Sequence, residues 1–169
     1  MRNIRGASTT EALVQLSIGL AVALVIGSAA LGYFDKASRG VELNIALDKV
    51  SAAGRAFYGD DILRTRCMTP SLPLNISNLI NRGYIKSTDV LGRSWTMNIA
   101  YINSTTAGYT KPASLIITID FPSLQDMQKM LSEVNPSSAV GQRLSFQYSL
   151  AGNPSGDWSN FNKTTGCFA

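Results

Sequence analysis

The feature that most constrains this chain is a run of 23 residues without a charged side chain, at positions 12–34. In a helix this run would extend about 34 Å, and the hydrocarbon core of a bilayer is about 30 Å thick. We therefore predict a membrane-spanning helix. The apolar core of a cleavable secretory signal is shorter, about 7 to 15 residues. The alternative is that this run is such a signal, with cleavage after Ala29-Ala30.

Two arginines, Arg2 and Arg5, precede this run. By the positive-inside rule they keep the N-terminus in the cytoplasm and send the rest of the chain outward. Both cysteines, Cys67 and Cys167, then lie in an oxidising compartment that would let them pair. Two unpaired thiols are the alternative, whereas a metal site would need more ligands than two thiols in a chain without histidine.

Composition argues against several classes of function. The 169 residues allow one ordinary domain with a short appendage. The formal charge of +4 falls to a weak excess of basic residues if the first six residues are removed, so no specific nucleic-acid partner is predicted. A chain without histidine, a phosphate-binding glycine loop or a Cys-x-x-Cys pair offers no catalytic residues, cofactor site or metal site. We predict that it is not an enzyme.

Two adjacent acids, Asp60 and Asp61, are one group that could carry chemistry. They could be catalytic carboxylates or calcium ligands. Adjacent acids after a helix end are more often solvated, and that is the interpretation we favour. The aromatic residues Trp95 and Tyr148 could belong to a ligand surface, although packing in the sheet or core is favoured.

The helical pattern continues beyond residue 34 but becomes one-sided. Charged residues mark one face, and apolar residues recur on the other at helical spacing: Leu43, Leu47, Val50 and Phe57. A single helix over 7–58 is predicted, ending near Gly59-Asp60-Asp61.

The remaining chain predicts a small α+β domain. Strands are expected at 95–102, 114–121 and 144–150, with a polar loop between the first two and a turn at 89–92. A short helix is expected at 76–82, capped by Asn75 or Ser77 and followed by Gly83. Another helix begins after Ser123, with one apolar face: Leu124, Met127, Met130, Leu131 and Val134. The amphipathic half of the long helix should pack on the antiparallel sheet.

The opening run RGASTTE, at the edge of the apolar segment, resembles the processing signal of type IV prepilins. In that family a membrane-embedded aspartyl peptidase cuts after the glycine on the cytoplasmic side, so the apolar helix is retained. The resemblance implies cleavage between Gly6 and Ala7, methylation of the new Ala7 amine, and a carboxylate, Glu11, at the fifth mature position.

The position of Glu11 has a physical interpretation. A carboxylate near hydrocarbon is costly unless it is paired or protonated. In a stack of parallel helices, the α-amine of a neighbouring subunit would neutralise it, so Glu11 would favour assembly over the lone monomer. The alternative is an ordinary signal anchor in which Glu11 lies solvated in the headgroup region.

Three further segments resemble the body of type IVb pilins, including those of conjugative thin pili: GYFDKASRGVELNIALDKVSAAGRAFYG, LINRGYIKSTDVLGRSW and SLIITIDFPSLQDMQKML. Two features depart from that family. The leader is short, and a cysteine that those proteins often carry is absent, with Met127 nearby. The resemblance therefore implies that a bridge between Cys67 and Cys167 differs from the usual one.

On this resemblance the chain divides into a leader (1–6), a hydrophobic transmembrane and assembly half of the helix (7–34), its amphipathic half (35–58) and a globular αβ domain with a C-terminal disulfide loop (59–169). The implied function is that of a structural pilus subunit, major or minor. Its implied partners are other pilin subunits, prepilin peptidase, the inner-membrane assembly machinery and, before assembly, membrane lipid. It would reside in the bacterial inner membrane and then in an extracellular pilus, serving adhesion, conjugation or a related task.

The alternatives are a membrane-anchored extracytoplasmic binding domain and a type II secretion pseudopilin.

Overall fold

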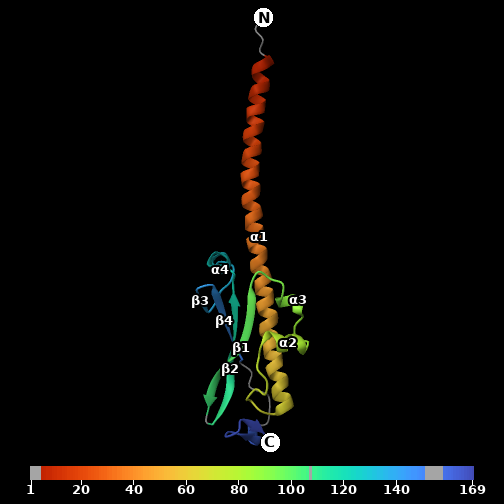
Figure 1. Cartoon of the computed structure of the whole chain (residues 1–169), viewed down its shortest axis with the longest axis vertical. Helices are drawn as coiled ribbons and strands as arrows, with labels where there is room; N and C mark the ends of the chain where they lie inside the picture. Colours follow the sequence, from red (N-terminus) through yellow and green to blue (C-terminus); the bar gives the residue numbers. More distant parts are fainter. Residues whose placement is uncertain (1–4, 107, 151–157) are drawn as a thin grey trace. The chain divides into compact units, whose positions relative to one another are not determined.

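The computed structural model describes the backbone of residues 5–106, 108–150 and 158–169, and the side chains of 13–28, 30, 37–105, 108–150 and 159–169. It combines helices with antiparallel sheet, so the predicted α+β class is confirmed (Figure 1). Two compact units meet in sequence between Arg39 and Gly40. Helix α1 (Arg5–Thr65) contributes residues to both units.

In the first unit, α1 presents its apolar side chains to the outside. Its described leucine, isoleucine and valine side chains are between 52% and 71% exposed, from Val22 to Leu16. At 100° per residue these positions are distributed around the whole helix, so described apolar side chains are exposed on every side of it. Within the described residues, no helical segment combines the length and the apolar character needed to cross a membrane.

In the second unit, α1 buries one face. The apolar residues that the helical spacing selected are all buried: Leu43, Leu47, Val50 and Phe57. The predicted end of the helix is wrong, because α1 continues through Gly59, Asp60 and Asp61 to Thr65. Contacts of Asp61 with a later loop, described below, account for the extension.

The sheet has four antiparallel strands in the order β1-β2-β4-β3. Its long hairpin consists of β1 (Thr96–Thr106) and β2 (Tyr109–Asp120), which run further than predicted and replace the expected polar loop. Gly108, with φ of +110°, lies at the turn, where a left-handed backbone favours glycine. Strand β4 (Arg143–Ser149) matches the prediction closely, whereas β3 (Ser138–Val140) was not predicted.

Three short helices complete the domain. Helix α2 (Ile76–Asn81) is capped by Asn75, whose side chain accepts a hydrogen bond from the amide of Asn78, so Ser77 is not the cap. Helix α3 (Ser87–Val90) replaces part of the predicted turn at 89–92. Helix α4 (Leu124–Leu131) begins at the predicted cap Ser123.

The predicted apolar face of α4 is only partly correct. Met127, Met130 and Val134 are buried, but Leu124 and Leu131 are 47% and 41% exposed. The helix is short, so it covers the core with a narrow arc of its surface and leaves the flanking leucines outside.

One core joins α1 to the inner face of the sheet and to the connecting segments (Figure 1). Its fully buried members come from α1, α2, β2 and β4: Leu43, Val50, Leu79, Leu115, Ile117, Ile119 and Leu144. Trp95 is 7% exposed and belongs to this core, as the packing interpretation predicted. Gly54 allows the side chain of Ile99 to pack closely against α1, since a Cβ at this position would lie 2.8 Å from Cδ1 of Ile99.

The C-terminal segment forms a small sheet of its own. A single turn of 3-10 helix, η1 (Trp158–Asn160), leads into β5 (Phe161–Asn162), which pairs with β6 (Cys167–Phe168). These strands are too short to show an alternating pattern, and the sequence predicted only turns here.

Candidate functional site

The predicted processing and assembly residues Gly6, Ala7 and Glu11 occupy helical positions in α1. Their side chains lie outside the described part of the structure. Cleavage after Gly6, methylation of Ala7 and pairing of Glu11 therefore remain predictions.

The apolar surface that follows them contains two hydroxyl groups, and both are turned back onto the helix. Ser17 donates a hydrogen bond to the carbonyl oxygen of Val14 at 2.8 Å, and Ser28 donates to that of Val25 at 2.9 Å. Such back-bonding satisfies a hydroxyl without solvent. Both hydroxyls therefore have a hydrogen-bond partner within α1 itself.

The second predicted feature, the bridge between Cys67 and Cys167, is confirmed, with a sulfur–sulfur distance of 2.02 Å. Backbone hydrogen bonds lie on either side of it: the Met68 amide donates to Gly166 (2.8 Å) and the Phe168 amide to Arg66 (2.7 Å). The bridge therefore fastens β6 to the segment that leaves α1, and we call this arrangement the clasp.

Aromatic packing holds the clasp against the β1–β2 hairpin. The ring of Phe161 lies 5.7 Å from that of Tyr109 and 5.0 Å from that of Phe168, measured between centroids. Gly166 has φ of +72° and faces the Tyr109 ring, so a side chain there would meet both backbone strain and a collision. None of these residues belongs to the main core, so the clasp is a separate packing cluster.

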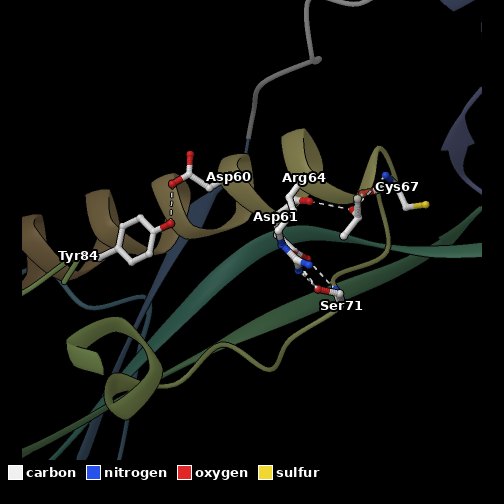
Figure 2. Close-up of polar contacts among 7 residues, drawn as sticks. Asp60, Asp61, Arg64, Cys67, Ser71 and Tyr84 are labelled. Atoms are coloured by element: carbon white, nitrogen blue, oxygen red, sulfur yellow. Dashed lines mark hydrogen bonds and ion pairs between the residues drawn. The ribbon is translucent and has the colours of Figure 1, made fainter. Parts of the chain in front are cut away.

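Asp61 connects the end of α1 to the loop that carries Cys67 (Figure 2). One carboxylate oxygen accepts hydrogen bonds from the Ser71 hydroxyl and from Arg64, both at 2.6 Å; the other accepts from the Ser71 amide at 2.7 Å. Thr65 donates to the Asp61 carbonyl, and its own hydroxyl accepts from the amide of Cys67. These bonds explain why the helix continues beyond the predicted stop.

The electrostatics of Asp61 follow from this geometry. The side chain is buried, which by itself would raise its pKa, but the hydrogen bonds from Ser71 and Arg64 outweigh burial and lower the pKa below its usual value. The carboxylate is therefore held in its charged form. The interpretation of Asp61 as a solvated acid is wrong.

Asp60 faces elsewhere: it is exposed and accepts a hydrogen bond from the Tyr84 hydroxyl at 2.5 Å (Figure 2). Because the two acids bind different partners, they do not form a pair of facing carboxylates of the kind used in acid–base catalysis. Among the described residues, no group of three or more acidic, cysteine or histidine side chains is placed to hold a metal ion.

Two tyrosines, Tyr58 and Tyr101, lie near Asp61. Tyr58 donates to the Met68 carbonyl at 2.8 Å, and burial raises its pKa to about 12. The ring of Tyr101 packs edge-on against that of Tyr58, and burial raises its pKa as well. Its buried hydroxyl has no hydrogen-bond partner in the described part of the chain. Both side chains are partly buried and their rings pack on each other, so we regard them as part of the domain's structure.

Sequence reasoning missed Ser71 and Tyr84 as partners of the two acids. Ser71 lies ten residues after Asp61 and Tyr84 lies 24 after Asp60. No local spacing connects residues so far apart, and only the fold brings them together.

Two features of the described residues stand out: exposed apolar side chains on α1 in one unit, and a disulfide in the other. Comparisons with protein-family models, with curated proteins and with solved structures find no significant match for this chain.

Proposed function

We propose that this chain is a structural subunit of a type IV pilus, most like the type IVb class, made as a prepilin. The observation that carries the proposal is the apolar surface of α1 in the first unit, where side chains such as Leu16 and Leu20 are 71% and 63% exposed. Leaving so much contiguous apolar surface in water is unfavourable. Lipid covers it before assembly, and the helices of other subunits cover it afterwards.

The sequence at the start of α1 distinguishes a pilin from a simple anchor. An anchor needs the apolar run and the basic residues before it, but it has no use for Gly6 and Glu11 at their fixed spacing. A pilin uses Gly6 for cleavage by prepilin peptidase and Glu11 for pairing with the amine of a neighbouring Ala7. An acid at the edge of hydrocarbon needs such a partner.

The second unit is suited to exposure outside the cell. Its C-terminal segment is fastened by the clasp to the segment that leaves α1, and structural disulfides persist in oxidising compartments. We therefore assign the chain to the inner membrane before assembly and to an extracellular filament afterwards, with the assembly machinery and other pilin subunits as partners.

The proposal is tested by mass spectrometry of the full chain, extracted from membranes of cells that contain a prepilin peptidase. We expect a mature N-terminus at Ala7, with a methylated amine. The matched control is Gly6→Leu, which should stay uncleaved because the peptidase requires a small residue before the cut. An intact Met1 in the unaltered chain, or cleavage beyond Ala30, would refute the pilin assignment and favour an anchor or a secreted domain.

A further inference from the structure

The exposed aliphatic side chains of the second unit lie mainly at one end of it. Among the described residues of this unit, seven leucine, isoleucine or valine side chains are exposed. Leu63, which is 80% exposed, lies close to the end of α1 at Thr65 and stands apart from the others. The other six lie around the start of the unit at Gly40, and we call them the apolar rim: Val41, Ile45, Leu91, Leu124, Leu131 and Val140.

Helix α4 brings two leucines to this end. Asn44 on α1 donates a hydrogen bond at 3.3 Å to the carbonyl oxygen of Glu133, two residues after α4, and a Cβ built on Gly40 would lie 2.6 Å from Cβ of Glu133. Leu124 and Leu131 are seven residues apart and therefore lie on the same side of α4. Figure 1 shows α4 at the upper end of the sheet. Two exposed leucines thus lie at the end of the unit that α1 enters.

The loop and strand members of the apolar rim lie at the same end. Glu42 on α1 forms an ion pair with Arg93, which brings the loop that contains Leu91 beside the start of the unit. In the sheet, Val140 lies across β4 from Asp120, the last residue of β2, and α4 begins shortly after it. The rim therefore draws its side chains from α1, a loop, α4 and β3, which share one end of the unit.

The chain enters this end directly from the uncharged run. Position 34, where that run ends, precedes Gly40, the first residue of the second unit, by six residues. Six residues span about 9 Å in a helix and at most about 22 Å when fully extended. The headgroup region adds about 5–8 Å on each side of the hydrocarbon core. The rim is therefore within reach of the headgroups of a bilayer that holds the run, whereas Leu63 lies 23 residues beyond Gly40, about 34 Å further along α1.

The charged side chains among the rim residues are joined in pairs of opposite sign. The three ion pairs are Glu42 with Arg93, Asp126 with Lys129 at 3.6 Å, and Asp120 with Arg143 at 2.7 Å. Each pair is neutral as a whole, so this end has no excess of one charge that would select a charged partner. A contact made here is therefore expected to rest on the burial of apolar surface.

We propose that the apolar rim rests on the outer surface of the bilayer before assembly, with Leu124 and Leu131 inserted among the lipid headgroups. The inference rests on the proposed function, which puts the uncharged run in the inner membrane. Clustered apolar surface marks a contact, and lipid is the apolar phase that the adjoining run brings within reach. Helix α4 then lies along the interface, while Met127 and Met130 on its other side stay packed in the core. The second unit is held to the membrane by its own surface as well as by the span.

Lipid contact is measured with the full chain, reconstituted at a low protein-to-lipid ratio in vesicles of phosphatidylethanolamine and phosphatidylglycerol. Leu124→Cys, Leu131→Cys and Leu63→Cys chains each receive an NBD label, while the native cysteines stay in their disulfide. Lipids that carry a nitroxide at the headgroup, present in both leaflets, quench labels that touch the membrane. We expect several-fold stronger quenching at Leu124 and Leu131 than at Leu63, the matched exposed leucine. Equal quenching at all three positions, or the strongest quenching at Leu63, would overturn the inference.

The protein-to-lipid ratio and the salt concentration identify what covers the apolar rim. Quenching by the nitroxide lipids that stays constant as the ratio falls supports contact with lipid. Shielding of the labels that appears only at a high ratio, without quenching by the nitroxide, would assign the rim to a second copy of the chain and overturn the inference. Because the contact is apolar, the quenching should change little at high salt. Loss of the quenching in salt would contradict an apolar contact.

A double substitution on α4 tests the two leucines with a reporter elsewhere on the rim. In a Val140→Cys chain labelled with NBD, Leu124→Gln together with Leu131→Gln should lower the quenching several-fold, because the polar side chains favour water over the interface. The matched control, Leu63→Gln, should leave the quenching unchanged. The predicted span keeps the chain in the vesicle in every variant, so the change reports contact of the second unit with lipid. Unchanged quenching in the double variant would overturn the role of α4.

Failure of this inference and failure of the proposed function give different results. Cleavage before Ala7 without selective quenching at Leu124 and Leu131 retains the pilin and overturns lipid contact by the rim. Selective quenching in a chain that keeps an intact Met1 in cells with a prepilin peptidase supports the lipid contact and refutes the pilin.

Discussion

The two parts of α1 have the same secondary structure and opposite surroundings. Leu20, in the first unit, is 63% exposed, whereas Leu47, in the second, is 2% exposed. Both are leucines in a helix, so helix propensity does not distinguish them. The difference teaches that the second part buries its apolar face within its own domain, while the described apolar side chains of the first part stay exposed.

The largest effect on the second unit is expected from the clasp. Replacing Cys67 and Cys167 with serine opens a loop with a sequence separation of 100 residues. Loop-closure entropy alone gives a loss of about 4.7 kcal/mol in the free energy of unfolding. Urea unfolding of the detergent-solubilised full chain, followed by fluorescence of the buried Trp95, measures it. A loss below about 1 kcal/mol would mean that the clasp contributes little to the stability of the domain.

A matched pair of leucine substitutions tests the contrast within α1 directly. Leu47→Ala should lower the free energy of unfolding by about 2–5 kcal/mol, because it leaves a cavity in the core. Leu20→Ala should leave domain unfolding unchanged, since Leu20 belongs to the first unit and is not a member of the core. Equal effects of the two substitutions on the same urea transition would contradict the division of the helix.

Asp61→Asn is expected to cost about 1–3 kcal/mol, because the buried amide cannot reproduce the bonds to Ser71 and Arg64. The exposed neighbour provides the control, since Asp60→Asn removes one surface hydrogen bond and should have a much smaller effect. Similar losses for both would mean that burial of Asp61 does not matter.

The contribution of Asp61 should also depend on pH. Its pKa is lower in the folded domain than in the unfolded chain, so the unfolded state takes up the proton first. Its stabilisation is complete above the ordinary aspartate pKa of about 3.9 and is lost as the pH falls through the folded value. The difference in stability between the unaltered chain and Asp61→Asn should therefore shrink below about pH 4. A difference that grows on acidification would contradict the sign.

The remaining effects, of opposite sign, are expected at two glycines of α1. Gly54→Ala should destabilise, because the added Cβ would collide with Ile99 and Leu115, a cost of about 1–3 kcal/mol that offsets the gain in helix propensity. Gly59→Ala meets open space and should stabilise by about 0.5–1 kcal/mol. Thermal unfolding measures the change in stability of both variants. A change of the same sign in both would contradict the assignment of Gly54 to a packed face and Gly59 to an open one.

Several parts of the fold could be predicted because their signals are local in the sequence, or because the sequence allows only one pairing. The spacing of Leu43, Leu47 and Val50 is a periodic pattern, and it predicted the buried face of α1 correctly. Ser123 before an apolar-periodic segment predicted the start of α4. The disulfide was within reach of prediction because only Cys67 and Cys167 can form one.

Other parts could not be predicted because distant residues decide them. Gly59-Asp60-Asp61 is typical of a helix end, yet Asp61 is held by Ser71, and the helix continues to Thr65. Strand β3 has three exposed residues, too few for an alternating pattern.

In the proposed pilin the first part of α1 functions between subunits, and a substitution of Glu11 tests this role most directly. The measurement compares filament yield with membrane insertion for the full chain and for Glu11→Gln, which keeps the size of the side chain and removes its charge. We expect normal insertion and normal cleavage at Ala7 with a loss of filaments, because the amine of the neighbouring subunit has no carboxylate to meet. Filaments at the unaltered level from Glu11→Gln would contradict this account.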